Sequence, residues 1–546
     1  QATTSAGALV TGGNITISAG SLTVSGGVQG SSDRAAFNGS SGANRATTLA
    51  NANIVATGNL AYTGGPVTLQ GGTARTQGSS GSANSAIAEA SAGIQVAGTK
   101  TLNITGDLQI LGGSALDSVV APNVGSAVAR AVLDPGALDA TASGNVVLSD
   151  GTVTGTGSAY SAVIASGVTL QADGMSIGGT INAGGGTVIL RPNSTTRNIN
   201  IESGATSGVL SLNPSELQKI TAGTLEIGRT TDTGTLSVNT ALNTADVNAA
   251  TLILQHQNIS VNGDIGSAVT PFQHDLALLA GNGVSTNNSI VLHSGGSLAL
   301  VAATGDLDIM PSTVPTRVES LDMALLAGGN VNVGSASGTQ STTVLANRLL
   351  TVGAASNFTV RGGAEAGAFT SVGGGGLTVI ATVGDVIVAG GGGSNASATV
   401  SGTPDVDMLV AGVVRLDAGT GTGASAAISA GSATSIRLEL PNLESGGFFV
   451  NGQEGVVYDA ATATGFLAGG APAVLGQSLL VTYGGAPPPS SPPSTREPGV
   501  QQAINTIVQS TTEASRTGER TASQDAGPTE EEKQKEKEER ARAVCN

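Results

Sequence analysis

The chain has 546 residues, of which 82 are glycine, and its formal net charge is −16 at pH 7. Aromatic residues make up 2% of the sequence, charged residues make up 11%, and there is no tryptophan. This composition offers mainly small and β-branched side chains for a core, which excludes a helical bundle and disfavours a conventional α/β enzyme. The acidic balance makes nucleic acid and anionic membrane surfaces poor partners.

The N-terminal third of the chain repeats itself. Strand-like segments with the sequences LTVSGG, VTLQGG, LQILGG and TVTGTG end at glycines that are 45, 41 and 43 residues apart, namely Gly26, Gly71, Gly112 and Gly155. Later the repeat shortens to steps of 27, 28 and 28 residues between the strand ends Val333, Val360, Val388 and Leu416. Repeats of this length predict a stacked architecture.

The content of each repeat predicts the type of stack. Segments such as NITISAG, NISVNGDI and LTVIATVGDVIV alternate aliphatic with polar residues, which is typical of strands with one buried face. Glycine, Asn-Gly and Gly-Asp separate the segments where corners are expected. The sequence therefore predicts an all-β fold, a right-handed parallel β-helix with coils of ~22–28 residues and roughly 17–22 coils.

The longer N-terminal repeats contain additional residues. The segment SSDRAAFNGSSGANRATTLANAN returns as GSSGSANSAIAEASAG at about the same place in the next repeat. We expect these segments to be loops that project from one side of the rod and to be the first place to look for binding.

The end of the chain differs from the repeats. Five of the eleven Phe and Tyr residues lie near the last strands and predict a cap over the final coil: Phe448, Phe449, Tyr458, Phe466 and Tyr483. A Pro-rich linker follows at 484–499. Residues 500–546 begin with an amphipathic pattern (Val500, Ala503, Ile504, Ile507, Val508) and finish as a charged tail, which predicts a short helix.

The expected organisation therefore has five parts. Coils with long insertions occupy 1–180, and coils with shorter loops occupy 181–447. The aromatic cap spans 448–483, the linker 484–499 and the amphipathic, charged tail 500–546.

Residues for catalysis or cofactor binding are sparse. The three histidines, His256, His274 and His293, have no second ligand at metal spacing, so we predict no metal site, no cofactor and no catalytic site. Two acid pairs, Asp306/Asp308 and Asp405/Asp407, would each share one face of a strand, as paired acids do in polysaccharide-cleaving β-helix enzymes. The alternative is that these acids keep exposed strands soluble, and we favour it because aromatic platforms for sugars are missing.

The single cysteine, Cys545, is the penultimate residue of the sequence. One cysteine excludes an internal disulfide framework. Cys545 could tether the chain through an intermolecular disulfide, or it could be an ordinary thiol on a terminal segment.

Two segments resemble a known family. The stretch Ser207–Arg229, SGVLSLNPSELQKITAGTLEIGR, together with the strands after it, resembles the haemagglutinin-like repeats of large bacterial exoproteins related to filamentous haemagglutinin. The segment Thr464–Gly484, TGFLAGGAPAVLGQSLLVTYG, resembles the end of many such exoproteins. The resemblance covers about residues 180–484, and the N-terminal third is similar in composition only.

The resemblance implies a two-partner secreted protein of a Gram-negative bacterium. Its partners would be an outer-membrane β-barrel transporter and a receptor or glycan on a host cell or bacterium, with self-association as a further expectation. The family's cysteine pair and N-terminal secretion domain are absent here, so we expect this chain to be a C-terminal portion of a longer exoprotein.

Three functions remain open from the sequence. The first is an extracellular, non-enzymatic β-helical adhesin or adhesin stalk at the cell surface, acting in attachment, aggregation or biofilm formation. The second is a purely structural rod or matrix filament. The third is a polysaccharide lyase or hydrolase built on a β-helix.

Overall fold

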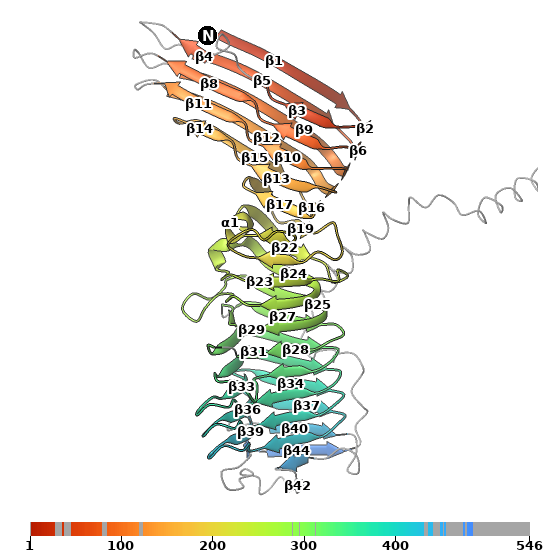
Figure 1. The fold of residues 1–546 in the computed structure, drawn as a ribbon, viewed down its shortest axis with the longest axis vertical. Helices are drawn as coiled ribbons and strands as arrows, with labels where there is room; N and C mark the ends of the chain where they lie inside the picture. Colours follow the sequence, from red (N-terminus) through yellow and green to blue (C-terminus); the bar gives the residue numbers. More distant parts are fainter. Residues whose placement is uncertain are drawn as a thin grey trace, which may run out of the picture. The chain divides into compact units, whose positions relative to one another are not determined.

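The computed structural model describes residues 2–27, 35–37, 45–78, 85–119, 124–286, 288–293, 295–311, 313–403, 405–430, 435–440, 448–450, 453–454, 473–475 and 478–483. The chain divides into two compact units, Gln1–Pro493 and Ser494–Asn546. All described residues belong to the first unit, and they form stacked coils of short parallel strands (Figure 1). The predicted parallel β-helix is confirmed.

The N-terminal coils contain the longest strands. Their strands are β1 (Ala2–Gly12), β2 (Ile15–Ala19), β3 (Leu22–Ser25), β4 (Ala35–Phe37), β5 (Arg45–Ala56), β6 (Leu60–Gly64), β7 (Val67–Gln70), β8 (Thr73–Gly78), β9 (Ser85–Ile104), β10 (Leu108–Leu111), β11 (Ser114–Val119), β12 (Val124–Ala142), β13 (Asn145–Ser149), β14 (Thr152–Thr154), β15 (Ser158–Ile164), β16 (Val168–Gln171) and β17 (Gly174–Ile177).

The next coils include a short α-helix and a single turn of 3₁₀ helix (Thr244–Asp246). The elements are β18 (Thr180–Asn182), β19 (Thr187–Arg191), β20 (Ile199–Ile201), β21 (Leu210–Leu212), α1 (Pro214–Leu217), β22 (Ile220–Gly228), β23 (Thr235–Val238) and β24 (Asn248–Val261).

The remaining described coils are the most regular. Their strands are β25 (Asp275–Thr286), β26 (Ile290–Val291), β27 (Ser297–Ala302), β28 (Leu307–Ile309), β29 (Thr316–Ala327), β30 (Val331–Val333), β31 (Thr342–Ala354), β32 (Phe358–Arg361), β33 (Thr370–Gly373), β34 (Leu377–Thr382), β35 (Val386–Ala389), β36 (Ser397–Gly402), β37 (Val406–Val410), β38 (Val414–Asp417), β39 (Ser425–Ala430), β40 (Ser435–Leu440), β41 (Phe448–Val450), β42 (Gln453–Glu454), β43 (Ala473–Leu475) and β44 (Ser478–Tyr483).

A regular coil has three strands, one on each face of the solenoid. In the coil that begins at Leu377, β34, β35 and β36 pair in parallel with β37, β38 and β39 of the next coil. Val333 lies opposite Val360, Val360 opposite Val388, and Val388 opposite Leu416. The predicted steps of 27, 28 and 28 residues are therefore the true register of these coils.

Coil length varies along the chain. Ala2 pairs with Ala46 in the first described coils, whereas Ala162 pairs with Thr180 in a much shorter coil. The first two predicted N-terminal steps match the register, because Leu22 pairs with Val67 and Val67 pairs with Leu108. The third step was wrong: β10 pairs with β13, so Asp150 and not Gly155 follows Gly112, while TVTGTG belongs to β14 beside β11.

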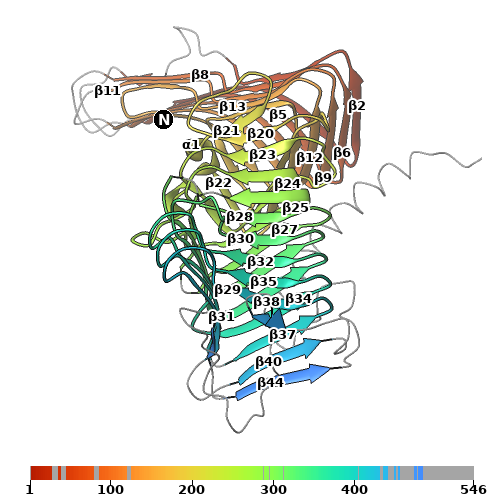
Figure 2. The ribbon, with the colours of Figure 1, turned by 60° about the horizontal axis from the view of Figure 1, so that its bottom comes forward.

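Where the structure describes the N-terminal insertions, they are strands rather than loops, so the expectation of loops was wrong for those residues. The first halves of β5, β9, β12 and β15 face a separate sheet of β14, β11, β8 and β4, and we call this two-layered extension the wing (Figure 2). Among the described residues, its buried polar members include Thr76 and Asp117, which are joined by a hydrogen bond from Thr76 Oγ1 to Asp117 Oδ1 at 2.5 Å. Its buried apolar cluster consists of alanines: Ala50, Ala74, Ala88, Ala90, Ala115, Ala127, Ala129 and Ala159. Alanine lets two sheets approach closely, and this explains why the insertions are rich in alanine and serine.

The main core is continuous along the stack. It runs from Val24 to Ile428, and its inward rows consist of stacked aliphatic side chains such as Leu252, Leu276 and Leu298. Each fully buried leucine of this kind contributes ~2 kcal/mol of transfer free energy. Stability is therefore distributed over many coils, each of which contacts its neighbours.

The outward face of the central strands is also buried, which simple alternation did not predict. Ile253, Ala277 and Ala324 point away from the core and are 1%, 0% and 1% exposed. Their strands contain continuous apolar runs, LIL, LALLA and MALLA, and such runs are typical of strands buried on both faces.

The C-terminal part is described only in strands. Phe448 and Phe449 lie in β41, which pairs with β38, and Tyr483 lies in β44, which pairs with β40. Tyr458 and Phe466, the linker 484–499, the tail 500–546 and Cys545 lie outside the described residues. The aromatic cap, the helical tail and the tether remain predictions.

Candidate functional site

Asp306 and Asp308 take part in contacts between coils. Asp306 Oδ1 accepts hydrogen bonds from Asn330 N at 2.6 Å and from Asn330 Nδ2 at 3.1 Å. Asp308 Oδ1 accepts one from Asn332 Nδ2 at 2.8 Å. Both acids are only partly exposed, and each bonds to the coil that follows it.

Asp306 belongs to a row that we call the corner ladder: Asp306, Asn330, Asn357 and Asp385. Asn330 Oδ1 accepts from Asn357 N at 3.1 Å, Asn357 Oδ1 from Asp385 N at 2.7 Å, and Asp385 Oδ1 from Val413 N at 3.0 Å. Each side chain thus satisfies a backbone donor at the corner of the next coil. The Gly-Asp dipeptide that predicted corners occurs at both ends of this ladder, at Asp306 and Asp385. A Cβ on Gly329, which precedes Asn330, would overlap Asp306 Oδ1.

The second acid pair lies on another face. Asp407 lies in β37, where it pairs with Val379 of the preceding coil, and Asp405 O accepts a hydrogen bond from Thr378 N at 3.2 Å. The two acid pairs are therefore on different strands of different faces, and the structure does not bring them into one site.

The three histidines occupy unrelated positions. His274 packs edge-on against Phe272 with ring centroids 5.1 Å apart, and His293 accepts a hydrogen bond from Gly295 N at 3.0 Å. His256 is fully buried. Across the described ranges, no three His, Cys, Asp or Glu side chains are grouped as a metal site requires.

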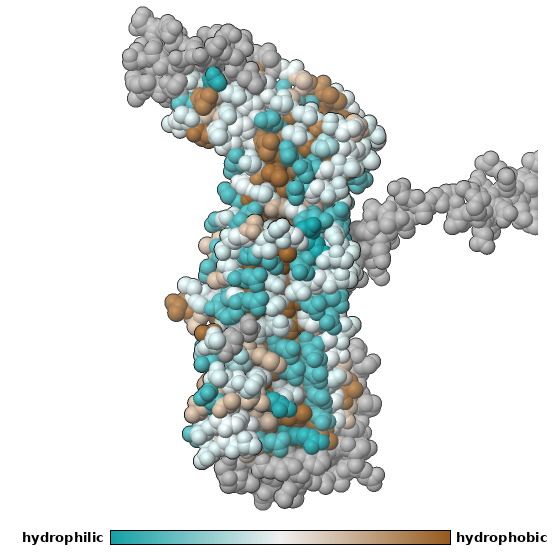
Figure 3. Space-filling view, in the orientation of Figure 1, coloured by the Kyte–Doolittle hydropathy of each residue, from teal (hydrophilic) through white to brown (hydrophobic). Residues whose placement is uncertain are grey.

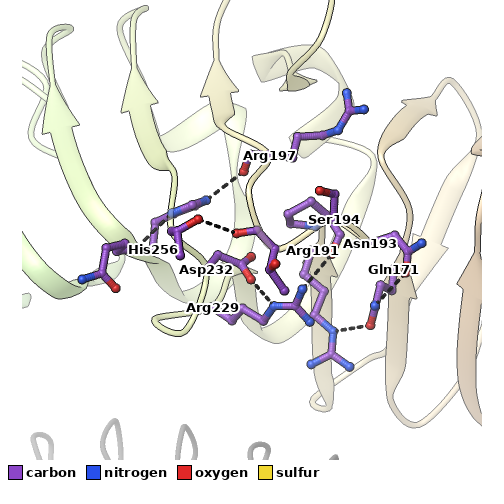
Figure 4. Close-up of polar contacts among 12 residues, drawn as sticks. Gln171, Arg191, Asn193, Ser194, Arg197, Arg229, Asp232 and His256 are labelled. Carbon is purple, nitrogen blue, oxygen red and sulfur yellow. Dashed lines mark hydrogen bonds and ion pairs between the residues drawn. The ribbon is translucent and has the colours of Figure 1, made fainter.

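His256 belongs to a set of buried and half-buried polar residues that we call the polar cluster: Gln171, Arg191, Glu226, Arg229, Asp232, Gln255 and His256. Figure 4 shows the contacts of Gln171, Arg191, Arg229, Asp232 and His256. Arg191 Nε donates to Gln171 Oε1 at 3.0 Å, and Arg229 Nε donates to Asp232 Oδ1. Gln257 N donates to His256 Nδ1 at 2.9 Å, so the ring proton is on Nε2, which lies 3.1 Å from Arg197 O.

The polar cluster connects three successive corners. Arg229 Nη2 donates to Pro192 O at 3.4 Å, and Thr233 N donates to Thr195 O at 2.7 Å. With the bond from His256 to Arg197 O, these contacts fasten segments 192–198 and 229–235 to the coil of β24. These contacts hold the three corners together.

Burial moves the pKa values of the cluster toward the neutral forms. It raises the pKa of Glu226 to about 7, against the opposing effects of the Gln255 amide and the Arg191 guanidinium. It also raises the pKa of Asp232, although the Arg229 guanidinium opposes this, and it lowers the pKa of His256. The Asp232 Oδ2 atom is buried and accepts no hydrogen bond from any residue that the structure describes, so the cluster carries an unmet acceptor.

The sequence interpretation did not single out this cluster. A signal was present, because Glu226 interrupts the apolar run TLEIG and Gln255-His256 interrupts LILQHQN. Charged and amide side chains inside buried runs indicate polar contacts across coils.

The wing has its own polar row on its outer face. Ser91 Oγ lies 2.7 Å from Asn51 Oδ1, and Arg130 forms an ion pair with Glu89 at 2.5 Å. The Glu89 and Arg130 side chains are 25% and 41% exposed, which makes this face a polar lateral surface available for contact. On the face shown in Figure 3, hydrophilic and intermediate residues predominate and apolar residues form small groups.

The chain matches no protein-family model, no curated protein and no solved structure. Within the part of the chain that the structure describes, no helix has the length and apolar composition needed to cross a membrane.

Proposed function

We propose that this chain is the β-helical rod of an extracellular surface adhesin, or the stalk of one, that attaches a Gram-negative bacterium to other surfaces. The observation that carries the proposal is the uninterrupted stack of parallel coils around one core from Val24 to Ile428. A repetitive rod of this kind offers an extended lateral surface.

The acids considered for catalysis support this proposal over an enzyme. Asp306 and Asp308 each bond to an asparagine of the next coil, which is a role in stacking. A general acid or base needs access to a substrate, and the corner ladder uses the Asp306 Oδ1 atom for a backbone amide.

Secretion through a two-partner outer-membrane transporter belongs to the same proposal. Its support is the resemblance of Ser207–Arg229 and Thr464–Gly484 to haemagglutinin-like exoproteins. The receptor would be a protein or glycan on a host cell or on another bacterium.

Adherence of cells that display the chain tests the proposal. Bacteria that export the full chain should adhere to epithelial cells or to one another more than isogenic cells without it. Equal adherence of both strains, with the chain demonstrated at the surface, would reject the adhesin. Concentration-dependent filaments of the purified chain in electron micrographs would instead support a structural rod.

A further inference from the structure

One outward face of the β-helix is more deeply buried than an open sheet face should be. Ala324 of β29 points away from the core, since Met323 and Leu325 on either side of it belong to the core, and it is 1% exposed. Thr351 of β31, which lies opposite Ala324 in the register, is 4% exposed. Side chains on an open sheet face keep contact with water, so these values indicate that something covers this face.

The covered face is an apolar strip that crosses successive coils. Four of its residues are at most 6% exposed, two are half-buried, and all six lie outside the main core cluster. We call this set the apolar strip: Ala299 and Val301 of β27, Ala324 and Leu326 of β29, and Leu349 and Thr351 of β31. The described strands in extensive contact with β27, β29 and β31 all belong to the same or directly adjacent coils, so none of them packs over the strip.

The last described strand ends on the same face of the solenoid. The strand β44 pairs with β40, and the pairing continues through β37, β34 and β31 to β29. In this register Thr482 lies in the same row as Leu326. Gly484 and Gly485 follow Tyr483 directly, and two glycines allow a chain to turn back over a sheet.

The residues that follow are long enough to reach the strip. Residues 484–493 have the sequence GGAPPPSSPP, and the compact unit that contains the coils extends to Pro493. In a polyproline II conformation these residues would span roughly 31 Å. The five strand pairings from β44 to β29 correspond to roughly 24 Å. The segment can therefore cross the whole distance along the sheet.

Proline is chemically suited to cover such a strip. A segment that lies on an apolar sheet face loses water from its own backbone amides, and the face offers no acceptors in return. Proline has no N–H group, and a polyproline II segment is already extended before it docks, so little entropy is lost. Three residues of polyproline II rise by roughly 9.3 Å, which matches roughly 9.6 Å for two coils, so the rings can meet the strip at regular intervals.

We propose that residues 484–493 pack as an extended, proline-rich cover on the apolar strip of the same chain. The prolines of this cover are Pro487, Pro488, Pro489, Pro492 and Pro493. The cover would keep the apolar strip away from water and from other chains. This inference concerns the rod itself and does not depend on what the rod binds.

The reactivity of a single thiol in the folded full chain tests the proposal. In a Cys545→Ser background, Thr351→Cys should react with a maleimide on the order of tens of fold more slowly than Val383→Cys, whose position is 45% exposed. Replacement of the five prolines by serine should bring the rate of Thr351→Cys close to that of Val383→Cys. Ala324→Cys serves as the probe of the same strip if Thr351→Cys does not fold.

A matched control leaves the prolines in place and changes the amphipathic pattern that follows them. The triple variant Val500→Ser, Ile504→Ser and Ile507→Ser should keep the thiol protected. Loss of protection in this variant would assign the cover to residues 500–508 and overturn the proposal.

Three further outcomes would overturn it. One is equal reactivity of the strip thiol and Val383→Cys in the chain with its prolines, which would show an open face. Another is protection that persists after the prolines are replaced. The third is protection that disappears on dilution, which would show that a second copy of the chain covers the strip.

Discussion

Gly71 lies directly against the backbone of Arg130, from the opposite side of the solenoid. A Cβ on Gly71 would be 2.7 Å from the Arg130 carbonyl carbon and 2.8 Å from its amide nitrogen. Gly26 meets Ser91 and Gly112 meets Tyr160 in the same way, and Ser91, Arg130 and Tyr160 are register partners. The repeated glycine therefore lies where two sheets touch, and we call this contact between Gly26, Gly71, Gly112 and the facing strands the waist. The main core lies on one side of the waist, and the alanine core of the wing lies on the other.

Gly71→Ala should destabilise the N-terminal coils by about 1–3 kcal/mol, because the new methyl group has rigid backbone as its neighbour. Calorimetry and hydrogen exchange of β9 and β12 would measure the loss. Gly20→Ala is the matched control, since no atom lies within 4 Å of its Cβ position. An unchanged stability for Gly71→Ala would contradict the waist.

The corner ladder predicts different effects for two substitutions of Asp306. Asp306→Asn keeps an acceptor for Asn330 N and should change stability little. Asp306→Ala leaves that backbone donor without its partner and should cost about 1–2 kcal/mol. Chemical unfolding of the two variants checks the difference, and equal losses would argue that the side-chain acceptor is unimportant.

Lys100 predicts a pH-dependent stability. It is fully buried between Leu60 and Leu138 in the register, and its Nζ donates to Ile94 O at 3.3 Å. Burial lowers the pKa of Lys100 to about 7, with Asp134 opposing the shift. The unfolded chain binds the proton up to its ordinary pKa, so stability should rise as pH increases from about 7 to about 10.

Lys100→Met should remove this dependence and stabilise the N-terminal coils at pH 7, by on the order of 4 kcal/mol. Thermal unfolding across pH 6–10 provides the measurement. Lys219→Met, at a side chain that is 42% exposed, serves as the control and should have little effect. If the stability of Lys100→Met depended on pH as strongly as that of the wild-type chain, the Lys100 ammonium group could not be the cause of the dependence.

Glu216 predicts an effect on the end of the five-stranded sheet β17-β13-β10-β7-β3. Its Oε1 accepts from Ile177 N of β17 at 3.0 Å, while Oε2 accepts from Asn213 N at 2.9 Å in the capping box of α1. Glu216→Ala should therefore cost about 1–2 kcal/mol and increase exchange at Ile177. Glu216→Gln keeps one acceptor and should therefore lose less stability than Glu216→Ala. Full protection of the Ile177 amide from exchange in Glu216→Ala would contradict the role of Glu216 as its acceptor.

The sequence was sufficient for the fold class and for the register of the regular coils. Val333, Val360, Val388 and Leu416 mark strand ends at nearly constant spacing, so the period could be read directly. The predicted register was wrong at Gly155, because the coil there is shorter and the next strand that ends in glycine belongs to another face. The strands of the wing were also not predicted, since segments rich in alanine and serine have weak strand signals. These segments form strands because equivalent segments of neighbouring coils pair with them.

Polar residues inside apolar runs signalled the polar cluster, but which of them meet could not be predicted from the sequence. Gln171, Glu226 and His256 are far apart in the chain, and their approach depends on coil lengths that differ at each step. The two aspartates of the corner ladder, in contrast, lie at predicted Gly-Asp corners, and the row could have been recognised once the coils were aligned.

The most direct test of the proposed function is binding by the purified, folded chain itself. Beads coated with the full chain should bind host cells or the source bacterium in a saturable manner, and soluble chain should compete. Binding should disappear when the chain is heat-unfolded and should be unaffected by Asp306→Asn. Absence of saturable binding to either surface, by a chain whose coils are shown to be folded by hydrogen exchange, would contradict a rod that is itself the adhesin.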